Sequence, residues 1–170
     1  RRLYAVDPVA RMVELGATLL INISASPFEI GKGELRYELI RTHARKHGVP
    51  MVFVNQVGGN DELVFDGGSM AFDADGSPLL LAPFFREFVM TFDSKAQPTD
   101  CLYRPLPKVE AVYQALVLGL RDYLKKCGFK GAVLGLSGGI DSALVCCLAV
   151  EALGKENVFG VTMPSPYSSS

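Results

Sequence analysis

The sequence predicts an α/β chain built in two parts. Apolar runs of strand length alternate with stretches of helical periodicity along most of the chain. A polar segment with three prolines, at 96–107, interrupts this alternation and is the expected linker. Of the 170 residues 49% are apolar, and the net charge is -1. This is a globular composition without the basic excess typical of nucleic-acid-binding proteins, and no apolar run reaches the ~18 residues of a membrane span.

The first part, residues 1–95, is expected to combine two helices with mixed strands. Pro8 opens a helix over 9–15, and a second helix has its apolar residues between 35 and 44. Strong turn signals separate short apolar segments in the later half of this part, and the run at 19–23 is expected to be buried on both faces. The predicted strands are 19–23, 51–57, 63–65, 69–72, 79–82 and 88–92.

The second part, residues 108–170, reads as a long helix followed by one βαβ unit. An amphipathic helix is predicted over 109–124, with Gly128 after it. The unit consists of a buried strand at 132–136, an apolar helix at 143–153 and a strand at 158–163. A strand, a crossover helix and a second strand imply a parallel sheet.

A glycine-rich loop, Gly135–Ser142, joins the strand to the helix of this unit and predicts a phosphate site. The N–H groups at a helix N-terminus attract anions, and Gly138 and Gly139 let the backbone approach phosphate oxygens. Ser137 and Ser142 offer hydroxyl donors, whereas the carboxylate of Asp141 fits beside phosphates only with a cation between them, which suggests Mg2+. The alternative is an ordinary βα turn with Ser or Asp as the N-cap. No Lys follows the glycines, which disfavours chemistry at a γ-phosphate.

The motif Ser-Gly-Gly-Ile-Asp-Ser resembles the loop of the ATP pyrophosphatases, and its surroundings narrow that resemblance. Residues 110–143 with 163–165 look like the start of the synthetase domain of the glutamine-dependent NAD+ synthetases. Residues 22–32 and 54–69 resemble the second part of that family's nitrilase-like glutaminase domain. The resemblance implies the C-terminal part of a nitrilase-like α-β-β-α sandwich joined to the first βαβ unit of a Rossmann-like ATP pyrophosphatase domain. It also implies that the chain is an internal fragment.

The resemblance implies a ligase that adenylates the carboxylate of deamido-NAD+ with ATP, releases pyrophosphate and forms NAD+ with ammonia from glutamine. The implied ATP-binding residues are Gly135, Leu136, Ser137, Gly138, Gly139, Ile140, Asp141 and Ser142. Asp141 is also the implied Mg2+ ligand. Alternatives are a free-standing nitrilase or amidase, and for this piece alone a non-catalytic nucleotide-binding module. Members of the family are homo-oligomers, and we expect a cytoplasmic protein without nucleic-acid or membrane partners.

The implied glutamine-binding residues are Ser26 and Lys32, which match the family's Ser and basic residue six positions apart. The alternative is that Ser26-Pro27 is a turn and Lys32 a solvated side chain. The catalytic Cys, Glu and Lys of the glutaminase are expected upstream of Arg1. None of the chain's own cysteines matches the nucleophile; these residues are expected to be small, reduced core side chains, and they are Cys101, Cys127, Cys146 and Cys147.

Two histidines, His43 and His47, lie four residues apart on the second predicted helix. This spacing suits a metal pair. No third ligand is near them in the sequence, so we expect both to be solvated surface residues.

Overall fold

The structure is a computed structural model that describes residues 7–95 and 103–164. By its contacts the chain divides into two compact units, one formed by Arg1–Val57 and Phe65–Lys108 and the other by Gly58–Val64 and Val109–Ser170. The expected linker at 96–107 lies partly outside the described residues, as does Cys101. The domain limits at 95 and 108 therefore remain a prediction.

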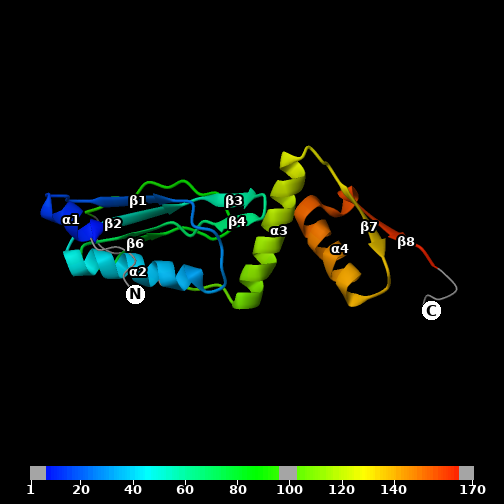
Figure 1. The fold of residues 1–170 in the computed structure, drawn as a ribbon, viewed down its shortest axis with the longest axis horizontal. Helices are drawn as coiled ribbons and strands as arrows, with labels where there is room; N and C mark the ends of the chain where they lie inside the picture. Colours follow the sequence, from blue (N-terminus) through cyan, green and yellow to red (C-terminus); the bar gives the residue numbers. More distant parts are fainter. Residues whose placement is uncertain (1–6, 96–102, 165–170) are drawn as a thin grey trace. The chain divides into compact units, whose positions relative to one another are not determined.

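The first unit contains a four-stranded mixed sheet in the order β1-β2-β5-β6 (Figure 1). These strands span Leu20–Ser24, Met51–Asn55, Met70–Phe72 and Pro78–Leu81. Strands β1 and β2 are parallel, while β5 is antiparallel to β2 and β6 is antiparallel to β5. The mixed set of strands that the turn signals predict is confirmed.

Helices α1 (Pro8–Glu14) and α2 (Lys32–His47) pack against this sheet and close its core (Figure 1). Helix α1 begins after Asp7, whose Oδ1 accepts hydrogen bonds from the backbone N–H groups of Val9 (3.1 Å) and Ala10 (3.3 Å). The buried core consists of Leu20, Ile40, Ala44, Val49, Met51, Phe53, Met70 and Phe72. The apolar face of α2 and the alternating positions of β2 thus meet, as their periodicities predict.

Two expectations for the first part are wrong. Residues 88–92 form no strand, although their apolar side chains alternate, because they line a pocket with residues of β2 and β5 and form no ladder with a neighbouring strand among the described residues. Strand β1 is not buried on both faces, since the side chains of Ile21 and Ile23 are 62% and 83% exposed.

The predicted strand at 51–57 is in fact two strands that belong to different sheets. Strand β2 ends at Asn55, and β3 (Val57–Asn60) pairs with β4 (Leu63–Asp66) as a two-stranded sheet. Within the second unit, the Gly59 N–H of this hairpin donates a 2.8 Å hydrogen bond to the carboxylate of Asp122.

The second unit contains α3 (Lys108–Lys126) and the predicted βαβ unit (Figure 1). Strands β7 (Ala132–Leu136) and β8 (Val158–Thr162) are parallel, with α4 (Ile140–Leu153) and the short 3-10 helix η1 (Lys155–Asn157) between them. The prediction is confirmed, except that α4 begins three residues earlier than the apolar run at 143.

Burial in this unit differs from expectation. Strand β7 is only half-buried, with Val133 71% exposed. Cys127 and Cys147 are free and exposed, and Cys146 is free and half-buried, so the prediction that these cysteines are core residues is wrong. Among the described residues, no helix has both the length and the apolar character to span a bilayer.

Candidate functional site

The glycine-rich loop lies at the carboxyl end of β7 and leads directly into α4. Gly139 is the N-cap of α4 and, having no side chain, provides no capping hydrogen bond. The alternative of an ordinary turn capped by Ser or Asp is therefore not what the structure shows. The first N–H groups of α4 are left without a side-chain acceptor at the helix N-terminus, where the helix dipole favours an anion.

The two serines hold the loop in shape. The Ser137 N–H donates to Ser142 Oγ (3.3 Å), and the Gly139 N–H donates to Ser137 Oγ (3.3 Å). Ser142 Oγ in turn donates to the Gly139 carbonyl oxygen (3.0 Å) and lies 3.1 Å from Ser137 Oγ. In the contact between the two hydroxyls either oxygen can be the donor. In this conformation the backbone N–H groups, rather than the serines, are the donors left for a ligand.

Gly138 is the residue that makes the loop's turn possible. Its φ is +81°, in the left-handed region where a Cβ is unfavourable. Beside it lies a pocket of about 440 Å³ whose walls come from the ends of both parallel strands. It is lined by Gly135, Leu136, Ser137, Gly138, Thr162, Met163 and Pro164. The carboxyl ends of parallel strands are where α/β sheets bind ligands.

Asp141 lies in the first turn of α4, and its side chain is exposed. None of the ion pairs formed by residues 7–95 and 103–164 involves this carboxylate. Its oxygens are thus free to accept a hard cation beside an anion bound at the helix N-terminus. Carboxylate oxygens are the ligands Mg2+ takes in proteins, so the residue fits the ion that the sequence suggests.

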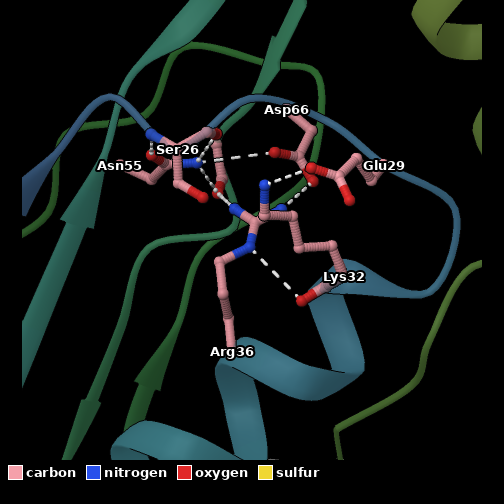
Figure 2. Close-up of polar contacts among 7 residues, drawn as sticks. Ser26, Glu29, Lys32, Arg36, Asn55 and Asp66 are labelled. Atoms are coloured by element: carbon pink, nitrogen blue, oxygen red, sulfur yellow. Dashed lines mark hydrogen bonds and ion pairs between the residues drawn. The ribbon is translucent and has the colours of Figure 1, made fainter. Parts of the chain in front are cut away.

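The first unit places Ser26 directly against Asn55, at the carboxyl end of β2 (Figure 2). The Ser26 N–H donates to Asn55 Oδ1 (2.9 Å), and Asn55 Nδ2 donates back to the Ser26 carbonyl oxygen (3.2 Å). Asn55 is 6% exposed. This pair of hydrogen bonds fixes the backbone of Ser26 and leaves its hydroxyl outside them.

A buried ion pair lies next to the side chain of Asn55. Arg36, on α2, and Asp66, at the end of β4, are 7% and 2% exposed and form an ion pair. Asn55 Nδ2 lies 3.4 Å from Asp66 Oδ1 and 3.0 Å from the carbonyl oxygen of Gly67, which Arg36 also contacts at 3.3 Å. We call Arg36, Asn55 and Asp66 the buried polar network. All three side chains are partnered, as buried polar groups must be.

Lys32 borders the same network (Figure 2). Its backbone carbonyl oxygen accepts from Arg36 Nε (3.4 Å), and its Nζ donates to Glu29 Oε1 (2.6 Å). The side chain of Lys32 is 26% exposed and that of Glu29 is 68% exposed. The backbones of both residues that the resemblance implies for glutamine, Ser26 and Lys32, therefore contact the buried polar network.

The network itself is what reasoning from the sequence missed. Arg36 and Asp66 are 30 positions apart, and a charged residue within a helix normally indicates a solvated face. The only local signal is Asn55, a polar residue that ends an apolar strand.

One titratable group beside α2 is strongly perturbed. Tyr103 stacks on Tyr37 with ring centroids 4.1 Å apart. Burial, followed by the negative charge of Glu34, raises the pKa of Tyr103 to about 12. The phenol therefore stays protonated at neutral pH and acts as a stacking group, not as a base.

Comparisons with known families find two matches, one in each part of the chain. Residues 3–98 match the family described as carbon-nitrogen hydrolase, and residues 112–170 match the family described as NAD synthase. The first match covers more than half of the chain.

Individual relatives match both parts together. The chain is 51% identical over 99% of its length to the glutamine-dependent NAD(+) synthetase of Synechocystis sp., and 40% identical over 96% of its length to that of Thermotoga maritima. It covers 31% and 35% of these proteins, about a third of the curated relatives' length. The resemblance to glutamine-dependent NAD+ synthetases is confirmed.

Solved structures agree with the fold. The glutamine-dependent NAD+ synthetase of Acinetobacter baumannii, determined in complex with ADP, has a TM-score of 0.84 and is 36% identical over 95% of this chain and 31% of its own. The corresponding enzyme of Cytophaga hutchinsonii has a TM-score of 0.69 and is 28% identical over 85% of this chain and 25% of its own. The predicted fold class is thus confirmed in both parts.

Proposed function

Since this chain belongs to the carbon-nitrogen hydrolase family, we propose that it is part of a glutamine-dependent NAD+ synthetase. Such a protein is a ligase that converts deamido-NAD+ to NAD+ with ATP, using ammonia released from glutamine. The observation that carries the proposal is the uncapped, glycine-rich N-terminus of α4 in a segment that matches the NAD synthase family. It follows a segment that matches the carbon-nitrogen hydrolases, so one chain contains parts of both activities.

The loop at Gly135–Ser142 is proposed to hold the pyrophosphate end of ATP. A carboxylate oxygen of the substrate attacks the α-phosphorus, and the bond to the leaving pyrophosphate breaks. The N–H groups at the start of α4 would stabilise the negative charge that develops on the leaving pyrophosphate. The hydrogen bonds of Ser137 and Ser142 already hold the loop in the conformation that orients these groups. Ammonia then attacks the acyl carbon, and AMP leaves with the carboxylate oxygen. The ADP complex of the Acinetobacter relative supports an adenine nucleotide as the ligand.

Asp141 is proposed to hold Mg2+, which supplies positive charge to offset the phosphates. The exposed carboxylate in the first turn of α4 supports this role. Without a cation, a carboxylate at this place would repel the anion that the helix terminus attracts.

In the first unit, Ser26 and Lys32 are proposed to bind the amino-acid end of glutamine. The hydroxyl of one and the ammonium of the other suit a carboxylate. The buried polar network keeps the Ser26 backbone fixed, so the Ser26 contact needs little reorganisation on binding, whereas the Lys32 ammonium exchanges its contact with Glu29 Oε1 for the ligand. The protein is further proposed to be a cytoplasmic homo-oligomer, as the resemblance implies.

Two alternatives account for less of the chain. A free-standing nitrilase or amidase leaves the NAD synthase match at residues 112–170 unexplained. A non-catalytic nucleotide-binding module leaves the carbon-nitrogen hydrolase match at residues 3–98 unexplained.

The test is an assay of the full-length protein that contains this chain, with deamido-NAD+, ATP and glutamine. We expect NAD+ and pyrophosphate in equal amounts, and a loss of at least about 100-fold in the Asp141→Ala variant, comparable to removing one stabilising group at a reacting centre. Glu156→Gln is the matched control, since Glu156 is an exposed acidic residue of the same unit. Undiminished NAD+ formation in Asp141→Ala would refute the role of the loop.

A further inference from the structure

The structure brings a third group to the two histidines of α2. Asp7, at the N-terminus of α1, lies beside His43 and His47 in the last turns of α2, and one ligand atom of each lies within 4.8 Å of the other two. The expectation that both histidines are solvated surface residues is wrong. The third ligand is 36 positions away in the sequence and approaches only because α1 packs on α2.

Two nitrogen atoms in this cluster are buried and have no partner. His43 Nδ1 and His47 Nε2 make no hydrogen bond with any described residue, and they are the two buried side-chain atoms in that condition. The His47 side chain is 10% exposed. A buried nitrogen without a partner costs about 1–3 kcal/mol, so the fold keeps two such groups together at a cost that a ligand would remove.

The two oxygens of the Asp7 carboxylate have different partners. Oδ1 caps α1 through Val9 and Ala10. Oδ2 faces the cluster, 4.0 Å from His47 Nε2 and 3.3 Å from the exposed Nζ of Lys46. Oδ2 can therefore bind a ligand without loss of the helix cap, in exchange for its contact with the exposed Lys46 ammonium.

We propose that Asp7, His43 and His47 bind a divalent cation of the Zn2+ class. Two imidazole nitrogens and one carboxylate oxygen are a zinc ligand set, and water completes the tetrahedron. Zinc holds each ligand atom about 2 Å away, which places ligand atoms ~3.3 Å apart. From separations of at most 4.8 Å, the side chains need to close by no more than ~1.5 Å. This site is separate from the glycine-rich loop and does not depend on the proposed function.

The surrounding charges decide how strong the site is. The ammonium of Lys46 competes with a cation for Asp7 Oδ2. The side chain of Lys46 is 52% exposed and can turn into solvent. The C-terminal end of α2 contributes the negative pole of the helix dipole, which favours a cation at this position. A bound ion would connect the start of α1 to the end of α2.

The test is to titrate the full-length protein that contains this chain with ZnCl2 and measure bound metal by equilibrium dialysis and elemental analysis. We expect one Zn2+ per chain and a higher melting temperature when it is bound. The key variant is Asp7→Asn, because Asn is an equally good N-cap and removes the carboxylate ligand together with its exposed ion pair to Lys46. His43→Gln and His47→Gln remove one nitrogen ligand each. Each change should weaken binding by more than about tenfold, the loss that even outer-shell changes can produce.

Lys46→Gln is the control with the opposite expected sign. It removes the ammonium that competes for Asp7 Oδ2 and should tighten Zn2+ binding severalfold; unchanged affinity would argue against Oδ2 as a ligand. Far-UV circular dichroism of every variant verifies that the fold is retained. Absence of binding by the wild-type chain would overturn the proposal. So would binding that survives Asp7→Asn and both histidine variants but disappears when the cysteines are alkylated.

Discussion

Replacing Asp66 by Asn should destabilise the first unit more than almost any other single polar change. Asp66 and Arg36 form an ion pair in which both side chains are nearly inaccessible, at 3% and 8% exposed. Asparagine keeps the shape of the side chain and its contact with Asn55 but removes the charge. The guanidinium of Arg36 then stays buried beside a neutral amide.

The expected loss follows from this burial. Removing one partner of a buried ion pair costs about 3–5 kcal/mol, because the other charge remains without compensation. A domain is typically stable by about 5–15 kcal/mol, so this is about a fifth or more of the total. The pair Arg11–Glu14 is the matched control, since its side chains are 61% and 64% exposed at a separation of 3.1 Å. Breaking it with Glu14→Gln should cost at most about 1 kcal/mol.

The free energies of unfolding can be measured by urea denaturation of the chain followed by far-UV circular dichroism, because the sequence has no Trp. A double variant, Arg36→Met with Asp66→Leu, should cost less than Asp66→Asn alone, since no charge is left buried. The reasoning is refuted if Asp66→Asn and Glu14→Gln differ by less than about 1 kcal/mol, or if the double variant is the least stable of the three.

Three further outcomes are expected. Phe72→Ala should cost about 3–5 kcal/mol in the same denaturation assay, because Phe72 is 0% exposed in the core, and a loss below 1 kcal/mol would contradict its place there. Tyr103, whose pKa is raised to about 12, holds its proton more tightly when folded, so stability should fall as pH rises from about 10 to 12. Tyr103→Phe should reduce that fall and remove a phenolate absorbance transition near pH 12; a transition near the ordinary value of 10.0 would count against its burial. Gly138→Ala, at a φ of +81°, should lower the melting temperature more than Gly139→Ala, at a φ of -86°, and equal effects would argue against the strained turn.

The elements from α3 to β8 in the second unit could be predicted almost entirely from the sequence. The limits of β7 agree with the predicted strand, and β8 is one residue shorter. Each apolar run there is bounded by glycines or by a polar loop, so the pattern marks both ends of an element. Helix α4 begins earlier than predicted because its first residues, Ile140–Ser142, look like loop by composition and become helical only through backbone geometry.

The strands of the first unit were harder to predict from the sequence. The apolar pattern continues from β2 into β3, and no local signal shows that Asn55 ends one sheet and Val57 begins another. Alternation at 88–92 describes the side chains correctly but cannot show whether a neighbouring strand offers hydrogen bonds. Strand assignment depends on pairing, which is not a local property.

The two candidate sites also differ in how far local sequence reveals them. The residues of the proposed phosphate loop are contiguous in the chain, so Gly135–Ser142 could be interpreted from spacing alone. Ser26 and Lys32 depended on a resemblance, since the residues that organise them, Asn55 and Asp66, come from distant strands. The cluster of Asp7, His43 and His47 was not predicted, because Asp7 precedes α1 whereas both histidines belong to α2.

The central claim is that the loop after β7 supports cleavage of ATP between its α and β phosphates. The most direct measurement uses the full-length protein that contains this chain, with ATP, glutamine and deamido-NAD+ carrying 18O in its carboxylate. Attack of that carboxylate on the α-phosphorus, followed by displacement with ammonia, leaves one labelled oxygen in AMP. We therefore predict AMP with one 18O and unlabelled pyrophosphate. Formation of ADP with labelled inorganic phosphate would contradict the account.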